Sequence, residues 1–204
     1  MSLEPTRDRI NPVAGRRPAA VLMLIRPLGE EAEPHLTFIR RSEKVRTHKG
    51  QVSFPGGSFS PEDEVLEQTA LRETHEELGI EPVRLQVLGP LAPVDTVVSN
   101  FMIYPFVAVP KEPFQELVYV PDDFEVAGVL EIPLRQLIHP GSLQEEEWVM
   151  RGKPRKVFFY NYRQTVIWGA TAFILRNFIA EINAGKWQIL FDNPSQWPLP
   201  ENPE

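Results

Sequence analysis

Short apolar runs alternate along the chain with turn-forming residues, and this pattern predicts a mixture of strands and helices. Apolar runs of about four to eight residues, bounded by glycine, proline and polar turn residues, are typical of strands. On this criterion we predict strands over residues 20–26, 36–40, 51–54, 84–91, 102–109, 126–132 and 157–162. Because segments with helical periodicity lie between and after these strands, the pattern is typical of the α/β class.

The most clearly delimited helix is predicted over residues 60–78. Ser60 can cap its first turn, Pro61 suits the first helical position, and Asp63 can complete a capping box. Gly79 follows the last periodic residue, and glycine there is a common helix terminator. We therefore expect one continuous helix from Ser60 to Leu78.

A second long helix is predicted over residues 167–183, where apolar side chains recur at helical spacing before Gly185. In this interpretation Trp168 belongs to the core. A shorter helix is expected over residues 134–138. Residues 1–18 are polar enough to form a loose arm, and residues 193–204 form a proline-rich tail, so the folded domain is expected to span residues 19–192.

Composition limits the functions that this chain can have. Its 204 residues are enough for one domain with a full core. The net charge of −7 argues against a general nucleic-acid binder, and the lack of cysteine excludes disulfides and a cysteine nucleophile. Arg16 and Arg17 precede an apolar run, as in a signal peptide, but we favour a buried strand because the run is short. We expect a cytoplasmic protein without a membrane partner, since no stretch is long enough to span a bilayer.

Acidic residues gather near the end of the first long helix. At 3.6 residues per turn, Glu73, Glu76 and Glu77 fall within an arc of roughly 100° on one side, while Leu71 and Leu78 point to the other. Like charges at this spacing repel each other, and a bound divalent cation removes that repulsion. The pattern indicates either a magnesium or manganese site or a solvated acidic face.

The residues around these glutamates resemble the signature of the Nudix hydrolases, in which a glycine precedes an acid, an Arg-Glu pair, a Glu-Glu pair and a glycine. The matching residues here are Gly57, Arg72, Glu73, Glu76, Glu77 and Gly79. The spacer after Gly57 is one residue longer than the common form, so either Asp63 or Glu64 can stand for the spaced acid. Thr74 replaces the usual apolar residue.

A second motif lies just upstream and resembles the coenzyme A pyrophosphatase branch of the same family. Its elements are an Arg-Ser pair, an arginine, a glycine and the sequence Phe-Pro-Gly-Gly. They are found here as Arg41-Ser42, Arg46, Gly50 and residues 54–57. Residues 167–172 also resemble the opening of that branch's C-terminal helix.

Together the two resemblances imply an α/β/α sandwich around a mixed sheet and a metal-dependent pyrophosphatase. The implied substrate is coenzyme A or acyl-CoA, cut into 3′,5′-ADP and (acyl-)4′-phosphopantetheine. In this interpretation Glu73, Glu76 and Glu77 bind Mg²⁺ or Mn²⁺, and the catalytic candidates are Glu76, Glu77 and Glu125. The alternative substrates are ADP-ribose, NADH and dinucleoside polyphosphates. A non-catalytic nucleotide sensor is a further alternative, although such modules usually lose glutamates that this chain keeps.

Basic residues and glycines upstream of the helix are the candidates for substrate binding. Arg40 and Arg41 alternate along a strand, so only one can face the cleft, and the Arg-Ser pairing selects Arg41. The full set of substrate-binding candidates is Arg41, Arg46, Lys49, Gly56 and Gly57.

Other residues have two interpretations each. The segment 151–156 can grip a third phosphate, but a hairpin turn with solvated charges fits its glycine and proline better. Phe101 and Tyr104 can stack on an adenine, and packing within a strand explains them equally well. Arg72 is expected to tie the helix to the preceding loop through an acidic partner.

Overall fold

The computed structural model describes residues 15–29, 31–96, 99–111 and 117–192, and the fold refers to these residues. Most of the expected arm and all of the expected tail lie outside them. None of the helices in these ranges is long and apolar enough to cross a bilayer.

The strands are β1 (Arg17–Leu28), β2 (Glu33–Arg41), β3 (Val52–Ser53), β4 (Gly56–Ser58), β5 (Leu85–Pro90), β6 (Val94–Asp95), β7 (Phe101–Pro110), β8 (Val126–Pro133), β9 (Leu143–Met150), β10 (Lys153–Tyr162) and β11 (Thr165–Trp168). The helices are α1 (Leu66–Leu78), α2 (Leu134–Ile138), α3 (Gly169–Asn183) and α4 (Ile189–Asp192), with short 3₁₀ turns η1 (Pro82–Arg84) and η3 (Pro140–Ser142).

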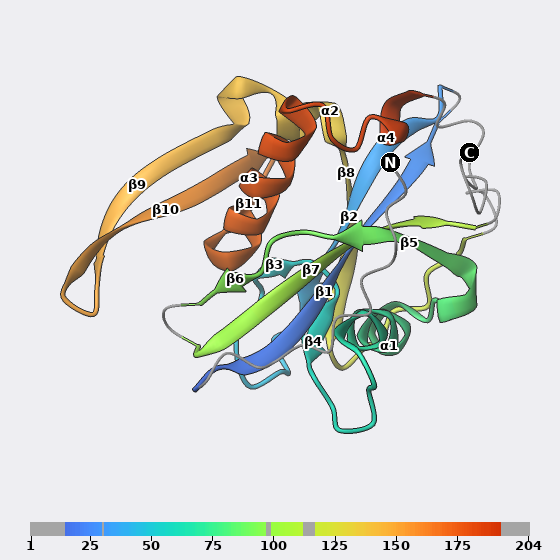
Figure 1. Ribbon diagram of the computed structural model, residues 1–204, viewed down its shortest axis with the longest axis horizontal. Coiled ribbons are helices and arrows are strands. Elements are labelled where there is room, and N and C mark those ends of the chain that lie inside the picture. Colours follow the sequence, from blue (N-terminus) through green and yellow to red (C-terminus); the bar gives the residue numbers. More distant parts are fainter. Residues whose placement is uncertain (1–14, 30, 97–98, 112–116, 193–204) are drawn as a thin grey trace.

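An eight-stranded mixed sheet forms the centre of the molecule (Figure 1). Its strand order is β3-β2-β1-β7-β5, with β4 paired to β1, β6 to β7 and β8 to β2. The long central pair, β1 and β7, is parallel, while the other pairs in this sheet are antiparallel. This arrangement confirms the mixed sheet that the family resemblance implied.

The two faces of the sheet are buried under different helices. Along β1, Ala20, Leu22 and Leu24 belong to the apolar cluster around α1, whereas Met23 and Ile25 belong to the cluster that contains α3. Successive side chains of a strand point to opposite faces, so β1 contributes to both cores, and its residues 18–25 are all apolar. The α/β/α sandwich is therefore confirmed.

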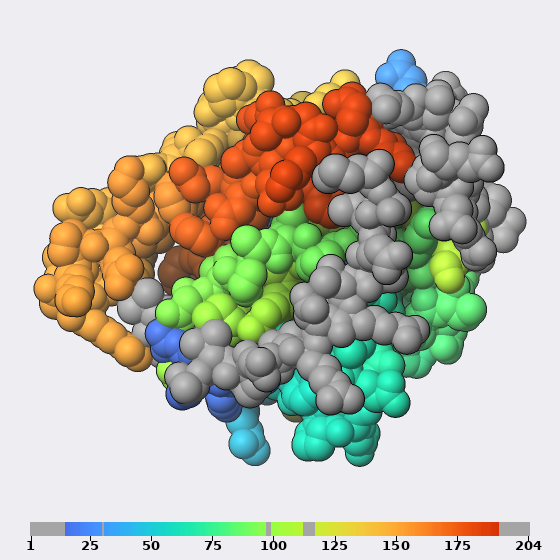
Figure 2. All heavy atoms as spheres, in the orientation of Figure 1, coloured from blue at the N-terminus to red at the C-terminus, as the bar shows by residue number. Residues whose placement is uncertain are grey.

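A separate three-stranded sheet, in the order β11-β10-β9, extends from the main body. Its β9–β10 hairpin projects at the left of Figures 1 and 2. The turn falls at Arg151 and Gly152, between the paired residues Met150 and Lys153, and its charges are exposed. The hairpin interpretation of segment 151–156 is confirmed.

Two predictions about this part of the chain were wrong. The strand β9 was not predicted, because half of its residues are polar and its three consecutive glutamates give no alternation. The predicted helix over 167–183 starts later, since Ile167 and Trp168 pair with β10 as part of β11. As a consequence Trp168 is exposed on a sheet face instead of lying in the core.

The start of the acidic helix also differs from the prediction. Residues 60–65 precede α1, which begins at Leu66, and Val65 at its N-cap makes no side-chain capping bond. The Ser60 amide donates to the Asp63 carboxylate at 3.0 Å, and the Asp63 amide donates back to the Ser60 carbonyl at 2.9 Å. This reciprocal pair closes a turn rather than a helix, because the Asp63 side chain is also drawn to Thr69 and Arg72. The predicted end is confirmed, since Gly79 has a left-handed φ of 69°.

Candidate active site

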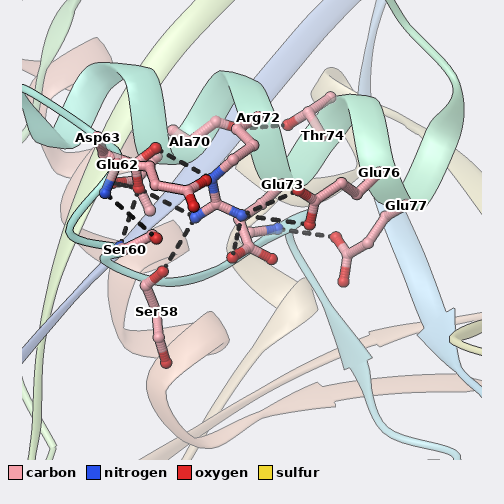
Figure 3. Close-up of polar contacts among 12 residues, drawn as sticks. Ser58, Ser60, Glu62, Asp63, Ala70, Arg72, Glu73, Thr74, Glu76 and Glu77 are labelled. Carbon is pink, nitrogen blue, oxygen red and sulfur yellow. Dashed lines mark hydrogen bonds and ion pairs between the residues drawn. The ribbon is translucent and has the colours of Figure 1, made fainter.

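The site is built where α1 passes over β4. Leu66, Ala70 and Leu78 bury the helix against the sheet, and this fixes the position of its polar side chains. Figure 3 shows the side chains of Glu73, Glu76 and Glu77 leaving the last turns of α1 on the same side. Their surroundings differ, and the difference decides what each can do.

Glu77 is the most deeply buried of the three glutamates, with 2% of its side chain exposed. One carboxylate oxygen accepts a hydrogen bond from the Gly56 amide at 2.9 Å, and the other lies 3.3 Å from an Arg41 guanidinium nitrogen. Burial raises the pKa of Glu77 to about 8, and the charges of Glu73 and Glu125 add to the increase. The Gly56 bond and the Arg41 charge oppose this rise without cancelling it. A negative charge at this position therefore needs more positive charge than the described residues supply.

Glu73 lies one turn before Glu77 and directly against the glycine pair. Its side chain is 17% exposed, and burial raises its pKa, while Arg72 beside it works in the opposite direction. A Cβ atom at Gly57 would collide with the Glu73 carboxylate, and one at Gly56 would collide with the backbone of β1. Gly56 also has a φ of 145°, which side chains rarely allow. Both glycines are thus required for the close contact between β4 and the carboxylates.

Glu76 has a more open position, with 55% of its side chain exposed. Both of its oxygens lie 3.2 Å from an Arg72 nitrogen. The Arg72 guanidinium also binds Glu73, Asp63 and the Ser58 carbonyl, so it connects the helix with the loop before it (Figure 3). The expectation that Arg72 ties the helix to the loop is confirmed, and its loop partner is Asp63 rather than Glu64.

Glu125 approaches the same carboxylates from the segment before β8. Its amide donates to the Asp122 side chain at 2.8 Å, and its carbonyl accepts from the Ser42 amide at 2.8 Å. Asp122 is in turn bound to the end of α1, because its amide donates to the Glu77 carbonyl at 3.1 Å. The Glu125 charge raises the pKa of both Glu73 and Glu77, so the three groups share one electrostatic environment. The anchoring role of Asp122 was not predicted from the sequence, although an aspartate after Pro121 is a common turn signal.

The chemistry of this donor set fits a hard divalent cation. Carboxylate oxygens are preferred ligands of Mg²⁺, and a cation would relieve both the desolvation of Glu77 and the repulsion among Glu73, Glu77 and Glu125. Among the described residues, no three acidic or histidine side chains already converge at coordinating distance. The carboxylates have arginine partners instead, since Arg41 contacts Glu77 and Arg72 contacts Glu73 and Glu76.

The predicted substrate-binding residues fall into two groups. Arg41, Gly56 and Gly57 meet the glutamates directly, and Arg40 points the other way, toward Thr165 of β11 at 3.3 Å. Arg46 and Lys49 are exposed on the loop between β2 and β3. This loop is joined to Arg41, whose amide donates to the Gln51 carbonyl at 2.9 Å and whose carbonyl accepts from the Gly50 amide at 3.0 Å. The proposed stacking residues have other partners, because Arg17 lies over the Phe101 ring and Tyr104 packs against the α1 cluster.

A mixed sheet whose glycine strand supports a row of helical carboxylates is the arrangement that the sequence resemblance implied, and comparison with known proteins agrees. The NUDIX domain model matches residues 15–151. The uncharacterized Nudix hydrolase NudL of Photorhabdus laumondii is 36% identical over 182 residues, which cover 89% of this chain and 92% of the relative. NudL of Escherichia coli is 36% identical over 177 residues, covering 86% and 88%. The chain therefore belongs to the Nudix hydrolase family and is an enzyme of that family.

A solved structure shows a similar fold over most of the chain. The DR0079 protein of Deinococcus radiodurans superposes with a TM-score of 0.51 and covers 82% of this chain and 87% of its own length. Its sequence identity is 16%, so the likeness concerns the fold alone.

Proposed function

We propose that this enzyme hydrolyses the pyrophosphate bond of coenzyme A or an acyl-CoA, giving 3′,5′-ADP and 4′-phosphopantetheine or its acyl form. The observation that carries the proposal is the contact between the upstream motif and the acidic helix. Arg41, which opens the motif, pairs with Glu77, and the motif's last glycines, Gly56 and Gly57, lie against Glu77 and Glu73. The upstream motif shares Gly57 with the Nudix signature, and its Arg41, 16 residues earlier in the chain, lies against the same helix, which supports one common site.

Glu73 and Glu77, with Glu76 at the open side, would hold Mg²⁺ or Mn²⁺. When bound, such an ion neutralises phosphate oxygens and lowers the pKa of water. Arg41 balances the charge of Glu77 in the present contacts, and a cation at Glu77 would release its guanidinium for a substrate phosphate. Gly56 and Gly57, which carry no side chain, let the diphosphate approach the backbone of β4 closely.

Glu125 is our candidate for accepting a proton from the attacking water. It is half-buried and reaches the site from a segment fixed by Asp122 and Ser42, so its backbone is held in place before substrate arrives. Holding a base in position contributes to catalysis independently of its basicity.

The test is turnover of a substrate panel with product identification. Purified enzyme with magnesium or manganese would be given coenzyme A, acetyl-CoA, dephospho-coenzyme A, ADP-ribose, NADH and a dinucleoside polyphosphate. We expect the highest kcat/KM for coenzyme A or its thioester, with 3′,5′-ADP among the products. A higher kcat/KM for ADP-ribose or a dinucleoside polyphosphate would refute the coenzyme A assignment and leave the pyrophosphatase chemistry in place.

A further inference from the structure

The three-stranded sheet β9–β11 has two faces of different character. One face packs under α3, and its Phe158, Tyr160 and Ile167 are buried in the core. Strand pairing places Trp148, Phe159, Val166 and Trp168 on the other face. The register sets Phe159 opposite Trp168 and Val166 opposite Asn161, and Trp148 lies across from Arg155. The solvent face of an antiparallel sheet is normally polar, so an aromatic face of this kind requires an explanation.

The rings on this face form a continuous surface. Trp148 lies 5.8 Å from Phe159 and 6.2 Å from Trp168 between ring centroids, with planes tilted by 53° and 45°. Tilted contacts of this kind are favourable between aromatic rings and leave ring faces open to a ligand. The two indoles are 38% and 37% exposed, respectively. The Trp148 ring is held in place, because its N–H donates to the Glu146 carboxylate at 2.7 Å.

This aromatic face and the loop before the glycine strand together line an open pocket of about 410 Å³. The pocket is lined by Lys49, Gly50, Gln51, Trp148, Phe159, Val166 and Trp168. Its volume falls within the usual range for small-molecule sites, and it combines apolar walls with few polar groups. Lys49 supplies positive charge at the rim, which suits a phosphorylated ligand.

The pocket and the carboxylate site share one short segment of chain. Gly50 and Gln51 line the pocket, and their backbone groups bond to Arg41, which pairs with Glu77. The neighbouring Arg40 donates to Thr165 at the start of β11 and so connects the hairpin sheet to β2. A ligand in the pocket therefore lies beside the chain segment that contacts Glu77 through Arg41.

We propose that the Trp148–Phe159–Trp168 face binds the flat base of a nucleotide, and that it holds the base of the substrate while the diphosphate lies at Glu73 and Glu77. The proposal rests on the proposed function only in taking a nucleoside diphosphate derivative as substrate, and it does not depend on coenzyme A. The face favours a nucleotide base, because a flat ring can stack on the exposed indoles. Lys49 at the rim can then pair with a phosphate of the same nucleotide.

The experiment measures binding of adenosine monophosphate (AMP), with ribose 5-phosphate as a matched probe that lacks the base. Titration calorimetry in EDTA removes turnover, so the result does not depend on which diphosphate is the substrate. We expect the double variant Trp148→Leu/Trp168→Leu to bind AMP at least ten-fold more weakly, while its affinity for ribose 5-phosphate stays unchanged. Phe191→Leu, an aromatic of similar exposure on α4 outside this pocket, is the control and should bind AMP normally.

A second variant pair protects the test against a folding defect. Trp148→Phe/Trp168→Phe keeps aromatic faces on both strands, so it should retain AMP affinity within a few-fold, and thermal melting compares the folding of all variants. Unchanged AMP affinity in the double leucine variant would overturn the proposal, as would an equal loss for both probes. Sedimentation equilibrium adds one further outcome. A dimer of the unmodified enzyme that the leucine variant converts to monomer would make this face an interface between copies, and the nucleotide proposal would be wrong.

Discussion

The α1–β4 site and the β9–β11 sheet depart in opposite ways from the usual distribution of polar and apolar side chains. Around α1, ionisable groups are buried, and Glu77 is almost without solvent contact. On the hairpin sheet, the indole rings of Trp148 and Trp168 are exposed to solvent. Each arrangement costs stability by itself, because buried charge loses hydration and exposed rings forgo burial. The two regions differ in what they lack, and we propose that each accepts a ligand that supplies it, a cation at the α1–β4 site and a flat apolar ring on the β9–β11 sheet.

Removal of divalent metal should have the largest effect and should separate the two regions. We expect EDTA to abolish hydrolysis, because the buried carboxylates then lack the cation that neutralises them and the phosphates. AMP binding at the aromatic face should persist under the same conditions. The measurement is product formation with EDTA, followed by added magnesium or manganese. Full hydrolysis in EDTA would contradict the metal site.

Replacing the buried charge itself comes next in size. Glu77→Gln should lower kcat/KM by on the order of 100-fold or more, since a ligand of the metal is lost. The melting temperature in EDTA should stay the same or rise. Burial raises the pKa of Glu77 to about 8, which means that its charged form destabilises the fold, and a neutral amide removes that cost. Steady-state kinetics and thermal melting give both values. The control is Glu64→Gln at an exposed acid on the loop before α1, which should change neither kcat/KM nor the melting temperature. Near-normal turnover of Glu77→Gln would exclude Glu77 from the site.

The ion pair between Asp63 and Arg72 should contribute to the stability of the fold and not to the chemical step. Burial by itself would raise the pKa of Asp63, but hydrogen bonds from Arg72, Ser60 and Thr69 outweigh it and hold the pKa below its ordinary value. A lowered folded-state pKa stabilises the fold at pH values above the unfolded-state pKa, and this stabilisation is lost as the pH falls through the folded-state value. Asp63→Asn should therefore reduce the free energy of unfolding by about 1–3 kcal/mol at pH 7.

The difference between Asp63→Asn and the unmodified enzyme should shrink at pH 3, below the ordinary pKa of an aspartate, because the stabilisation from a lowered folded-state pKa declines as the pH falls toward that pKa. Urea unfolding at both pH values measures it. A difference of the same size at both values would show that the side-chain shape matters rather than its charge. Glu64→Gln serves again as the control, and its stability should match that of the unmodified enzyme at pH 7.

The smallest effect is expected for the loop between β2 and β3, which carries Arg46. Arg46 is exposed on this loop, and we propose that it contacts a phosphate of coenzyme A that ADP-ribose lacks. Arg46→Ala should lower kcat/KM for coenzyme A by about ten-fold and affect residual hydrolysis of ADP-ribose less. Lys153→Ala, on the solvated hairpin turn, should leave both values unchanged. An equal loss on both substrates in Arg46→Ala would mean that Arg46 only braces the loop.

The sequence by itself determined the features that depend on local spacing. The periodicity of α1 placed Glu73, Glu76 and Glu77 on one side of the helix, and Gly79 fixed where it ends. The uninterrupted apolar runs of β1 and β7 predicted strands, which pair with each other in the centre of the sandwich. Local signals suffice for these features, because the geometry of a helix or strand is set within a few residues.

Only the tertiary structure decided how those local elements use their side chains. It separated the buried Glu77 from the exposed Glu76, and it brought Arg41 to Glu77 across 36 residues of chain. It also made α1 begin at Leu66 instead of near Ser60, because the Asp63 side chain binds Arg72 on the helix instead of capping the first turn. Finally, it placed Trp148 beside Trp168 on one sheet face. Burial, charge pairing and strand neighbours depend on contacts between distant segments, and the spacing of residues along the chain does not contain that information.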